Sequence, residues 1–98
     1  MTDVNVKPEL VQELCAFAQE RRVQKLMLFG SRARGDHHSK SDIDLAVQGG
    51  DVAGFTDDVN EKARTLLFFD VIDLDRPLPD AFRAEIMKDG KVLYEEIR

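Results

Sequence analysis

Two acidic residues, Asp42 and Asp44, lie one position apart inside the short apolar segment DIDLAV. Residues i and i+2 of a β-strand project from the same face, so both carboxylates point the same way while the apolar residues between and after them point into the core. Neighbouring carboxylates repel one another unless a positive charge lies between them. The pair is therefore either a solvated strand face or a site for a cation.

The residues that precede this segment favour the cation site. Gly30 and Ser31 directly follow the apolar run at residues 23–29. Glycine lets the backbone approach a ligand closely, and Ser31 could cap a helical turn while offering its hydroxyl and nearby N–H groups to a phosphate. Because magnesium commonly combines one or two carboxylates with substrate phosphates, the loop would hold phosphates and the acids would hold the metal.

A third acid, Asp70, lies in the apolar segment FFDVIDLD. A carboxylate there is costly unless it lies on an open face or is paired with a cation. Asp73 and Asp75 fall on the opposite strand parity, which predicts surface or turn residues. Asp73 is nevertheless close enough in sequence to remain an alternative third ligand.

Apolar periodicity predicts which elements position these residues. Helical spacing predicts helices over residues 8–20, 52–67 and 80–89, and shorter apolar runs predict strands over residues 23–29, 42–47 and 68–74. Residues 91–97 are predicted to form a last strand or an extended tail. The pattern predicts a single α/β domain over residues 1–98, with a small mixed sheet of three to four strands backed by helices.

Composition narrows the function classes. A formal net charge of -5 argues against a protein that mainly grips nucleic-acid phosphates, so no direct nucleic-acid partner is expected. The sequence shows no signal peptide and no stretch long enough to span a membrane, which predicts a cytoplasmic location and no membrane partner. The single cysteine, Cys15, is predicted to be a small buried hydrophobe on a helix.

The segments GSRARG and SDIDLAV together resemble the signature of the DNA polymerase beta-type nucleotidyltransferase superfamily. The size and spacing resemble its minimal stand-alone branch, the MNT proteins, which include the MntA-like antitoxins of HEPN/MNT pairs. The resemblance covers residues 23–94 approximately. It maps the metal-binding acids of the family onto Asp42, Asp44 and Asp70, and the pair that holds the β- and γ-phosphates onto Gly30 and Ser31.

The resemblance implies transfer of a nucleoside monophosphate, with pyrophosphate leaving and two magnesium ions stabilising the attacking and leaving oxygens. Asp42 and Asp44 would bridge both metals, and Asp70 would bind the one nearest the acceptor hydroxyl and help remove its proton. Arg32 and Arg34 could steady the pyrophosphate or could be solvated loop charges.

The remaining polar residues near this loop are given no chemical role. His37 and His38 are predicted to be exposed loop residues, because no third soft ligand lies near them in the sequence. Lys40 is predicted to be solvated, and Tyr94 is predicted to be a packing or tail residue.

The acceptor is suggested only by the resemblance. Minimal members of the family pair with a separate all-helical HEPN protein, act as its antitoxin, and in some cases transfer AMP from ATP to one of its tyrosines. The same function is expected here. Two alternatives stay open, namely transfer to a small molecule such as an aminoglycoside bound by a helical subunit, and a non-catalytic antitoxin that acts by steric binding. The sequence leaves the preferred base and the oligomeric state open.

Overall fold

A computed structural model describes residues 5–96 of the 98-residue chain. Its elements, in chain order, are α1 (Pro8–Glu20), β1 (Lys25–Phe29), α2 (Ser31–Arg34), β2 (Ile43–Gln48), α3 (Val52–Lys62), β3 (Phe69–Asp73), α4 (Asp80–Asp89) and β4 (Lys91–Glu95). The predicted last strand is therefore present as β4, although its expected end at Ile97 lies outside the described residues.

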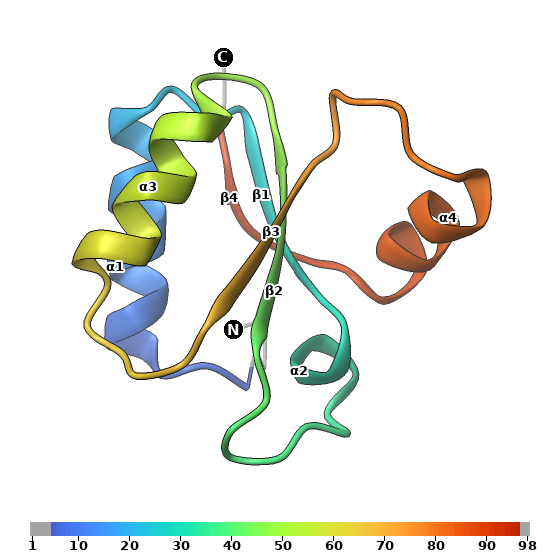
Figure 1. Cartoon of the computed structure of the whole chain (residues 1–98), viewed down its shortest axis with the longest axis horizontal. Helices are drawn as coiled ribbons and strands as arrows, with labels where there is room; N and C mark the ends of the chain where they lie inside the picture. The colour runs from blue at the N-terminus through green and yellow to red at the C-terminus, as the bar shows by residue number, and fades with distance from the viewer. Residues whose placement is uncertain (1–4, 97–98) are drawn as a thin grey trace.

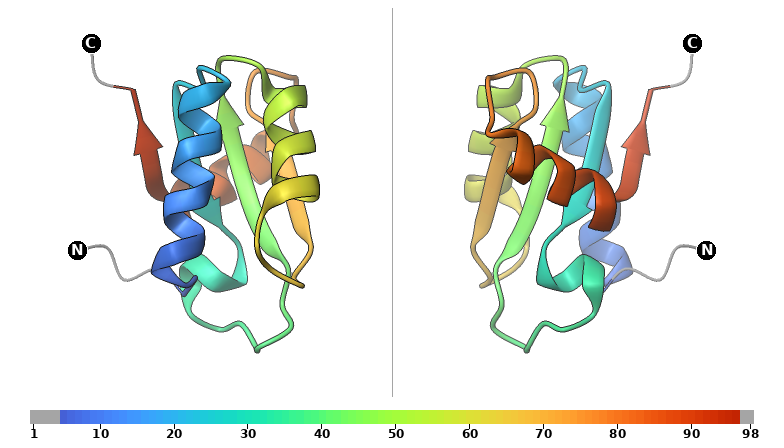
Figure 2. Two further views of the ribbon diagram at one scale, coloured as in Figure 1. Left: turned by 90° about the vertical axis from the view of Figure 1, so that its left-hand side faces the viewer. Right: turned by 90° about the vertical axis from the view of Figure 1, so that its right-hand side faces the viewer.

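The strands form one mixed sheet in the order β3-β2-β1-β4, which confirms the predicted fold class (Figures 1 and 2). Strand β1 runs antiparallel to both β2 and β4, whereas β2 and β3 are parallel. Parallel neighbours need a crossover connection, and α3 provides it. The end of β1 and the starts of β2 and β3 therefore meet at one end of the sheet.

Helices cover the two faces of the sheet unequally. Helices α1 and α3 lie on one face and enclose the larger core, whereas α4 lies on the other (Figure 1). The short α2 lies at the end of the sheet, where its Ala33 joins the larger core. The smaller core under α4 includes Ile86, and the ring of Phe82 contacts that of Phe29 edge-on with the centroids 6.1 Å apart. Met27, Ala46 and Leu74 complete the buried part of this smaller core.

Strand β2 contributes side chains to both faces of the sheet. Ile43, Leu45 and Val47 are fully buried in the core under α1 and α3. Asp44 and Ala46 alternate with them and point to the opposite face, where Ala46 joins the core under α4. The predicted alternation is confirmed.

Helix α1 has the predicted bounds, because Pro8 occupies its first turn and Leu10, Leu14 and Ala18 recur along its buried side. It ends where Arg22 adopts a positive φ of 58°. No helix within residues 5–96 is long and apolar enough to cross a membrane.

The predicted helix over residues 52–67 is too long. Helix α3 ends at Lys62, and Ala63 is already extended, with φ -66° and ψ 135°. The chain leaves the helix there, and Leu67 and Phe69 then pack against the large core from a non-helical segment. Tertiary packing at the sheet edge ends the helix although the apolar spacing continues.

Two packing predictions on single residues have different outcomes. Cys15 is only partly buried, and its thiol donates a hydrogen bond to the Leu93 carbonyl at 3.3 Å, so it is not the small buried hydrophobe that was predicted. Burial still raises the pKa of this thiol. Tyr94 packs against the large core, as expected.

Candidate active site

The parallel register of β2 and β3 places Asp44 directly beside Asp70. Both carboxylates lie on the face that α1 and α3 do not cover, since Leu45 and Val71 next to them pack into the large core. Asp42 precedes β2 by one residue and lies two positions from Asp44. Asp42 and Asp70 are exposed and Asp44 is half-buried, so the register brings together the three acids singled out from the sequence.

Gly30 lies against the carboxylate of Asp44. The last residue of β1, Phe29, pairs with Asp44, and Gly30 then turns the chain with a φ of 75°. A Cβ at position 30 would collide with the carboxylate of Asp44, so only glycine lets the backbone pass this close to the acid.

A short helix follows this turn. The Gly30 carbonyl accepts hydrogen bonds from the N–H groups of Ala33 and Arg34, both at 3.1 Å. Ser31 is the first residue of α2. The predicted loop therefore begins with one helical turn, and Ser31 lies at the end of the sheet where the acids gather.

The acids repel one another. Partial burial, followed by the charges of Asp70 and Asp42, raises the pKa of Asp44, while Arg34 acts in the opposite direction. Ionised together, these groups make a local excess of negative charge that a cation would relieve.

The chemistry of this donor set fits magnesium, which takes oxygen ligands. Residues 5–96 contain no ready-made group of three or more side chains that could hold a metal ion by themselves. Magnesium usually keeps several waters and takes substrate phosphates as further ligands, so carboxylates on an open face suit it better than a closed cage would.

The structure also separates the two candidates for the third acid. Asp73 lies on the other strand face, where it accepts a hydrogen bond from the Asp75 N–H at 2.9 Å and forms an ion pair with Arg76 at 3.5 Å. Asp70, by contrast, is paired in register with Asp44. The geometry thus favours Asp70 over Asp73.

Arg32 is placed differently from what a phosphate ligand requires. Its side chain is buried, and its guanidinium donates hydrogen bonds to backbone carbonyls of the loop and the N-terminal segment. These acceptors are the carbonyls of Ser41 at 3.1 Å, Asn5 at 2.8 Å, His38 at 3.5 Å and Ser39 at 3.3 Å. The side chain therefore holds the loop together, and this placement does not favour the suggested contact with pyrophosphate.

Arg34 is the arginine of this loop that faces the acids. It is exposed, and it forms ion pairs with Asp36 at 3.1 Å and with Asp89 at 3.4 Å. Its charge also acts on Asp44. Asp89 is the last residue of α4, so Arg34 connects α2 to α4. This connection lies at the edge of the acid cluster, by which we mean Asp42, Asp44 and Asp70.

The prediction of exposed loop residues holds for His38 and Lys40 but is wrong for His37, which is partly buried. His38 and Lys40 are exposed. His37 is less exposed, and its Nδ1 is buried with no hydrogen-bond partner among the described residues. No hydrogen bond or ion pair among the described residues joins any of these three side chains to Asp42, Asp44 or Asp70.

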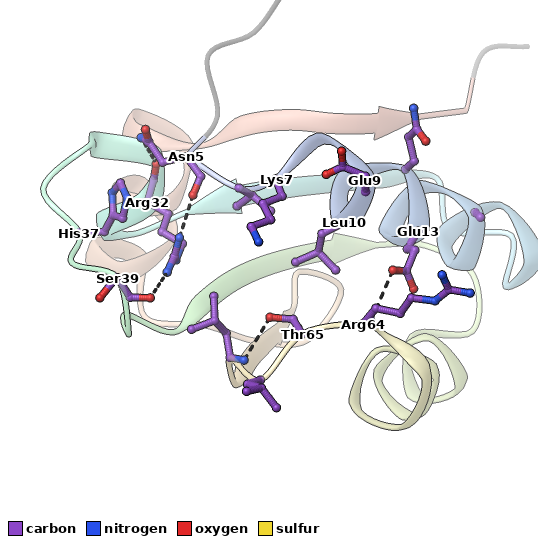
Figure 3. A pocket seen from close by; sticks show the side chains of 15 residues that line it. Asn5, Lys7, Glu9, Leu10, Glu13, Arg32, His37, Ser39, Arg64 and Thr65 are labelled. Carbon is purple, nitrogen blue, oxygen red and sulfur yellow. Dashed lines mark hydrogen bonds between the residues drawn. The ribbon is translucent and has the colours of Figure 1, made fainter.

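A groove of about 1020 Å³ lies away from the three acids, between α1 and the segment that connects α3 to β3 (Figure 3). Its lining carries mixed charge, with Lys7 and Arg64 on one hand and Glu9 and Glu13 on the other. Arg32 and His37 reach its edge from the loop. None of Asp42, Asp44 or Asp70 lines this groove, so it is not the reaction centre.

Sequence reasoning missed two residues that support the site. Asn5 donates its side-chain amide to the Arg32 carbonyl at 2.7 Å, and Asp89 pairs with Arg34. Their partners lie 27 and 55 positions away in the sequence, so no local pattern could have revealed these contacts.

A mixed sheet that brings three acids to the strand ends beside a Gly-Ser turn is the arrangement expected of a nucleotidyltransferase. The family described as "Polymerase beta, Nucleotidyltransferase" matches residues 12–98. The chain belongs to this family and is a nucleotidyltransferase.

Individual relatives agree with this assignment. The chain is 30% identical over 82 residues to a protein of Methanocaldococcus jannaschii that carries the name protein adenylyltransferase MJ0604, covering 74% of this chain and 80% of that one. A crystal structure of a toxin-antitoxin with AMP-PNP superposes with a TM-score of 0.70 at 21% identity, covering 88% of this chain and 73% of that one. A mutant of the toxin-antitoxin MntA-HpeT superposes with a TM-score of 0.69 at 19% identity, with the same coverage. At these identities the two structures show the shared fold.

Proposed function

We propose that the chain transfers AMP from ATP to a hydroxyl group of a partner protein and acts as the antitoxin of a toxin–antitoxin pair. The expected acceptor is a tyrosine of an all-helical HEPN-type toxin. The observation that carries the proposal is the register of Asp44 with Asp70, next to the Gly30 turn that passes against the Asp44 carboxylate.

Asp42, Asp44 and Asp70 are the residues that would hold magnesium, as two ions. When bound, magnesium neutralises charge on the triphosphate and on the leaving pyrophosphate. The excess of negative charge around Asp44 supports this assignment, because burial and the neighbouring acids already disfavour its ionised form. A cytoplasmic location, where ATP and magnesium are abundant, fits the proposal.

Different residues of this chain bind the phosphates, contact the leaving group and accept the proton. The Gly30 backbone and Ser31 orient the β- and γ-phosphates, and Arg34 contacts the pyrophosphate from the open face. The acceptor oxygen forms a bond to the α-phosphorus as the bond from that phosphorus to the α–β bridging oxygen breaks, and pyrophosphate leaves with the bond electrons. The proton of the acceptor hydroxyl passes to Asp70. Such a reaction depends mainly on positioning and charge neutralisation.

The names of the relatives support a protein acceptor. The M. jannaschii relative is named as a protein adenylyltransferase, and the matched crystal structures are titled as toxin-antitoxin structures, one of them with AMP-PNP. Transfer to a small molecule and purely steric neutralisation are the two competing functions, and the experiment below distinguishes all three.

Label transfer from ATP is the decisive test. The purified chain would be incubated with magnesium, host lysate and ATP labelled on the α- or the γ-phosphate. The Asp42→Asn/Asp44→Asn variant would be compared with an Asp73→Asn variant, which removes an acid from the opposite face of β3 as a matched control. We expect label on a protein band from α-labelled ATP only, with the unmutated chain and the control but not with the double variant.

Other outcomes would contradict the proposal in different ways. Label on a small molecule would indicate the alternative acceptor. If the double variant still neutralises the co-expressed toxin as well as the unmutated chain, neutralisation is steric and the catalytic proposal is wrong. Label from γ-labelled ATP would indicate phosphoryl transfer in place of nucleotidyl transfer.

A further inference from the structure

Two large apolar side chains lie exposed in the segment that leads into β3. Leu66 is fully exposed and Phe68 is 77% exposed. Neither core formed by the described residues includes Phe68. Single exposed apolar side chains are common on protein surfaces, so exposure alone assigns Phe68 no role. What distinguishes Phe68 is its position beside the three acids.

Backbone pairing places Phe68 beside the acids. Its carbonyl accepts a hydrogen bond from the Ile43 N–H at 2.9 Å, and Phe69 pairs with Ile43 in the register of β2 and β3. Phe68 is therefore the neighbour of Asp42 across the strand pair and precedes Asp70 by two positions.

Strand alternation gives the side on which Phe68 lies. Phe69 and Val71 pack into the large core, so Asp70 lies on the opposite face. Phe68 shares the parity of Asp70 and hence its face. In the right-hand view of Figure 2, α4 crosses the sheet and leaves uncovered the end where β2 and β3 begin. The exposed ring thus stands on the open face, next to the proposed proton acceptor.

We propose that Phe68 forms one wall of the acceptor subsite and selects an acceptor whose hydroxyl is carried by an aromatic ring. This inference rests on the proposed function, in which the acceptor hydroxyl lies at Asp70. Side chains at positions i and i+2 of a strand project from the same face roughly 6.6 Å apart, so a ring whose hydroxyl lies at Asp70 is large enough to lie beside the Phe68 ring. Paired aromatic rings attract one another beyond the area that they bury. A phenol whose hydroxyl lies at Asp70 contacts the Phe68 ring with its own ring. A small aliphatic alcohol in the same position does not reach Phe68.

Leu66 provides a matched control for this proposal. It lies in the same segment and is more exposed than Phe68, but it lines the groove against α1 and not the acid cluster. Replacing either residue removes an exposed apolar side chain, so neither change is expected to unfold the protein. Only the change at Phe68 should alter the choice of acceptor.

The first test uses two minimal acceptors, N-acetyl-L-tyrosinamide and N-acetyl-L-serinamide, with magnesium and α-labelled ATP. For Phe68→Ala we expect kcat/KM for the tyrosine probe to fall about tenfold through KM, with the serine probe unchanged within about twofold. Phe68→Trp should retain the preference for the tyrosine probe, and Leu66→Ala should change neither probe. An equal fall for both probes, or the same fall for Leu66→Ala, would overturn the assignment.

A binding measurement separates this inference from the proposed function. The NMR chemical shifts of the backbone amides would be followed during titration with N-acetyl-L-tyrosinamide in the presence of magnesium and AMP-PNP. We expect shifts at residues 68–70 that are lost in Phe68→Ala. Saturable shifts there without transfer to any acceptor would refute the proposed function and retain the aromatic subsite. Transfer to the partner with no shift at these residues would refute the subsite alone.

Discussion

Two carboxylates on opposite sides of the sheet, Asp58 and Asp44, have pKa values displaced in opposite directions. Hydrogen bonding from Arg21, with help from Lys62, lowers the pKa of Asp58. Burial and the charges of Asp70 and Asp42 raise the pKa of Asp44. One acid is surrounded by cations and the other mainly by acids.

The ion pairs around Asp58 connect the end of α1 to α3. Arg21, which follows α1, donates from Nε and Nη2 to the two carboxylate oxygens of Asp58 on α3, at 2.9 and 3.2 Å, and from Nη1 to Asp51 at 3.1 Å. Lys62 adds an ion pair to Asp58 at 3.3 Å, and the Asp58 side chain is only 4% exposed. A Cβ at Gly54 would meet both Asp51 and the Arg21 guanidinium, which explains a glycine inside α3.

The comparison shows that the same residue type can have its charge matched in one place and left unmatched in another. A buried acid whose charge is matched by bidentate arginine holds two helices together and needs nothing further. Acids whose charge is left unmatched on an open face destabilise the free protein and become useful only when a cation binds. The partners of a carboxylate thus separate Asp58 from the acids of the proposed site.

The largest expected effect is on catalysis. Asp44→Asn should lower AMP transfer more than about 100-fold, because it removes a proposed metal ligand. Asp58→Asn should leave transfer within about threefold at a temperature where both variants are folded. Initial rates with α-labelled ATP would measure both. A comparable loss in the two variants would mean that the two clusters are not functionally distinct.

Replacing the two loop arginines, Arg32 and Arg34, should affect different properties, namely stability in the first case and ATP binding in the second. Arg32→Ala should lower the free energy of unfolding by about 2–4 kcal/mol, since it leaves buried backbone carbonyls without their charged donor. Arg34→Ala should leave stability nearly unchanged, because exposed ion pairs contribute little, and should raise KM for ATP. Urea unfolding and steady-state kinetics on both variants would check this, and a raised KM with unchanged stability in Arg32→Ala would contradict it.

The pH dependence of stability should differ in sign between the two acids. The folded-state pKa of Asp58 is lowered, so its contribution is present above its unfolded value of about 3.9 and is lost as the pH falls through the folded pKa. The folded-state pKa of Asp44 is raised, so its ionisation destabilises the metal-free protein at neutral pH, and this penalty fades as the pH falls towards about 3.9.

Thermal melts from pH 7 to pH 3 would show the difference. At pH 7 Asp58→Asn should melt several degrees below the unmutated chain, and Asp44→Asn a few degrees above it, both without magnesium. Both differences should shrink towards pH 3. A melting temperature for Asp44→Asn below that of the unmutated chain at pH 7 would show that its charge is already compensated.

The smallest effect is expected from magnesium on the free protein. At a concentration equal to its dissociation constant, one bound ion adds about 0.4 kcal/mol of stability, which is about 2–3 °C in Tm for a domain of this size. The shift should be absent in Asp44→Asn and retained in Asp58→Asn. Equal shifts in these two variants would place the ion elsewhere.

Local patterns predicted much of the fold because burial in this small domain follows simple periods. The alternation in β2, the spacing of Leu10, Leu14 and Ala18, and the Pro8 start of α1 are each visible in a few consecutive residues. The family signature at Gly30–Ser31 and Asp42–Asp44 lies within 15 residues of sequence and therefore needed no tertiary information.

The errors and gaps lie where distant segments meet. The end of α3 at Lys62 depends on packing at the sheet edge, and the burial of Arg32 depends on carbonyls of Asn5 and the loop. Neither leaves a local signal, because an arginine in a basic loop and a continuing apolar spacing look the same whether they are exposed or packed.

The sequence by itself determined the family, the α/β class and the acids available for chemistry, because these follow from residue types at short, regular spacing. The tertiary structure alone decided which of these acids lie together. The register of β2 with β3 places Asp44 beside Asp70 and leaves Asp73 on the other face, and Arg21 forms an ion pair with Asp58. The physical reason is that electrostatic environment and strand register depend on contacts between residues far apart in the chain.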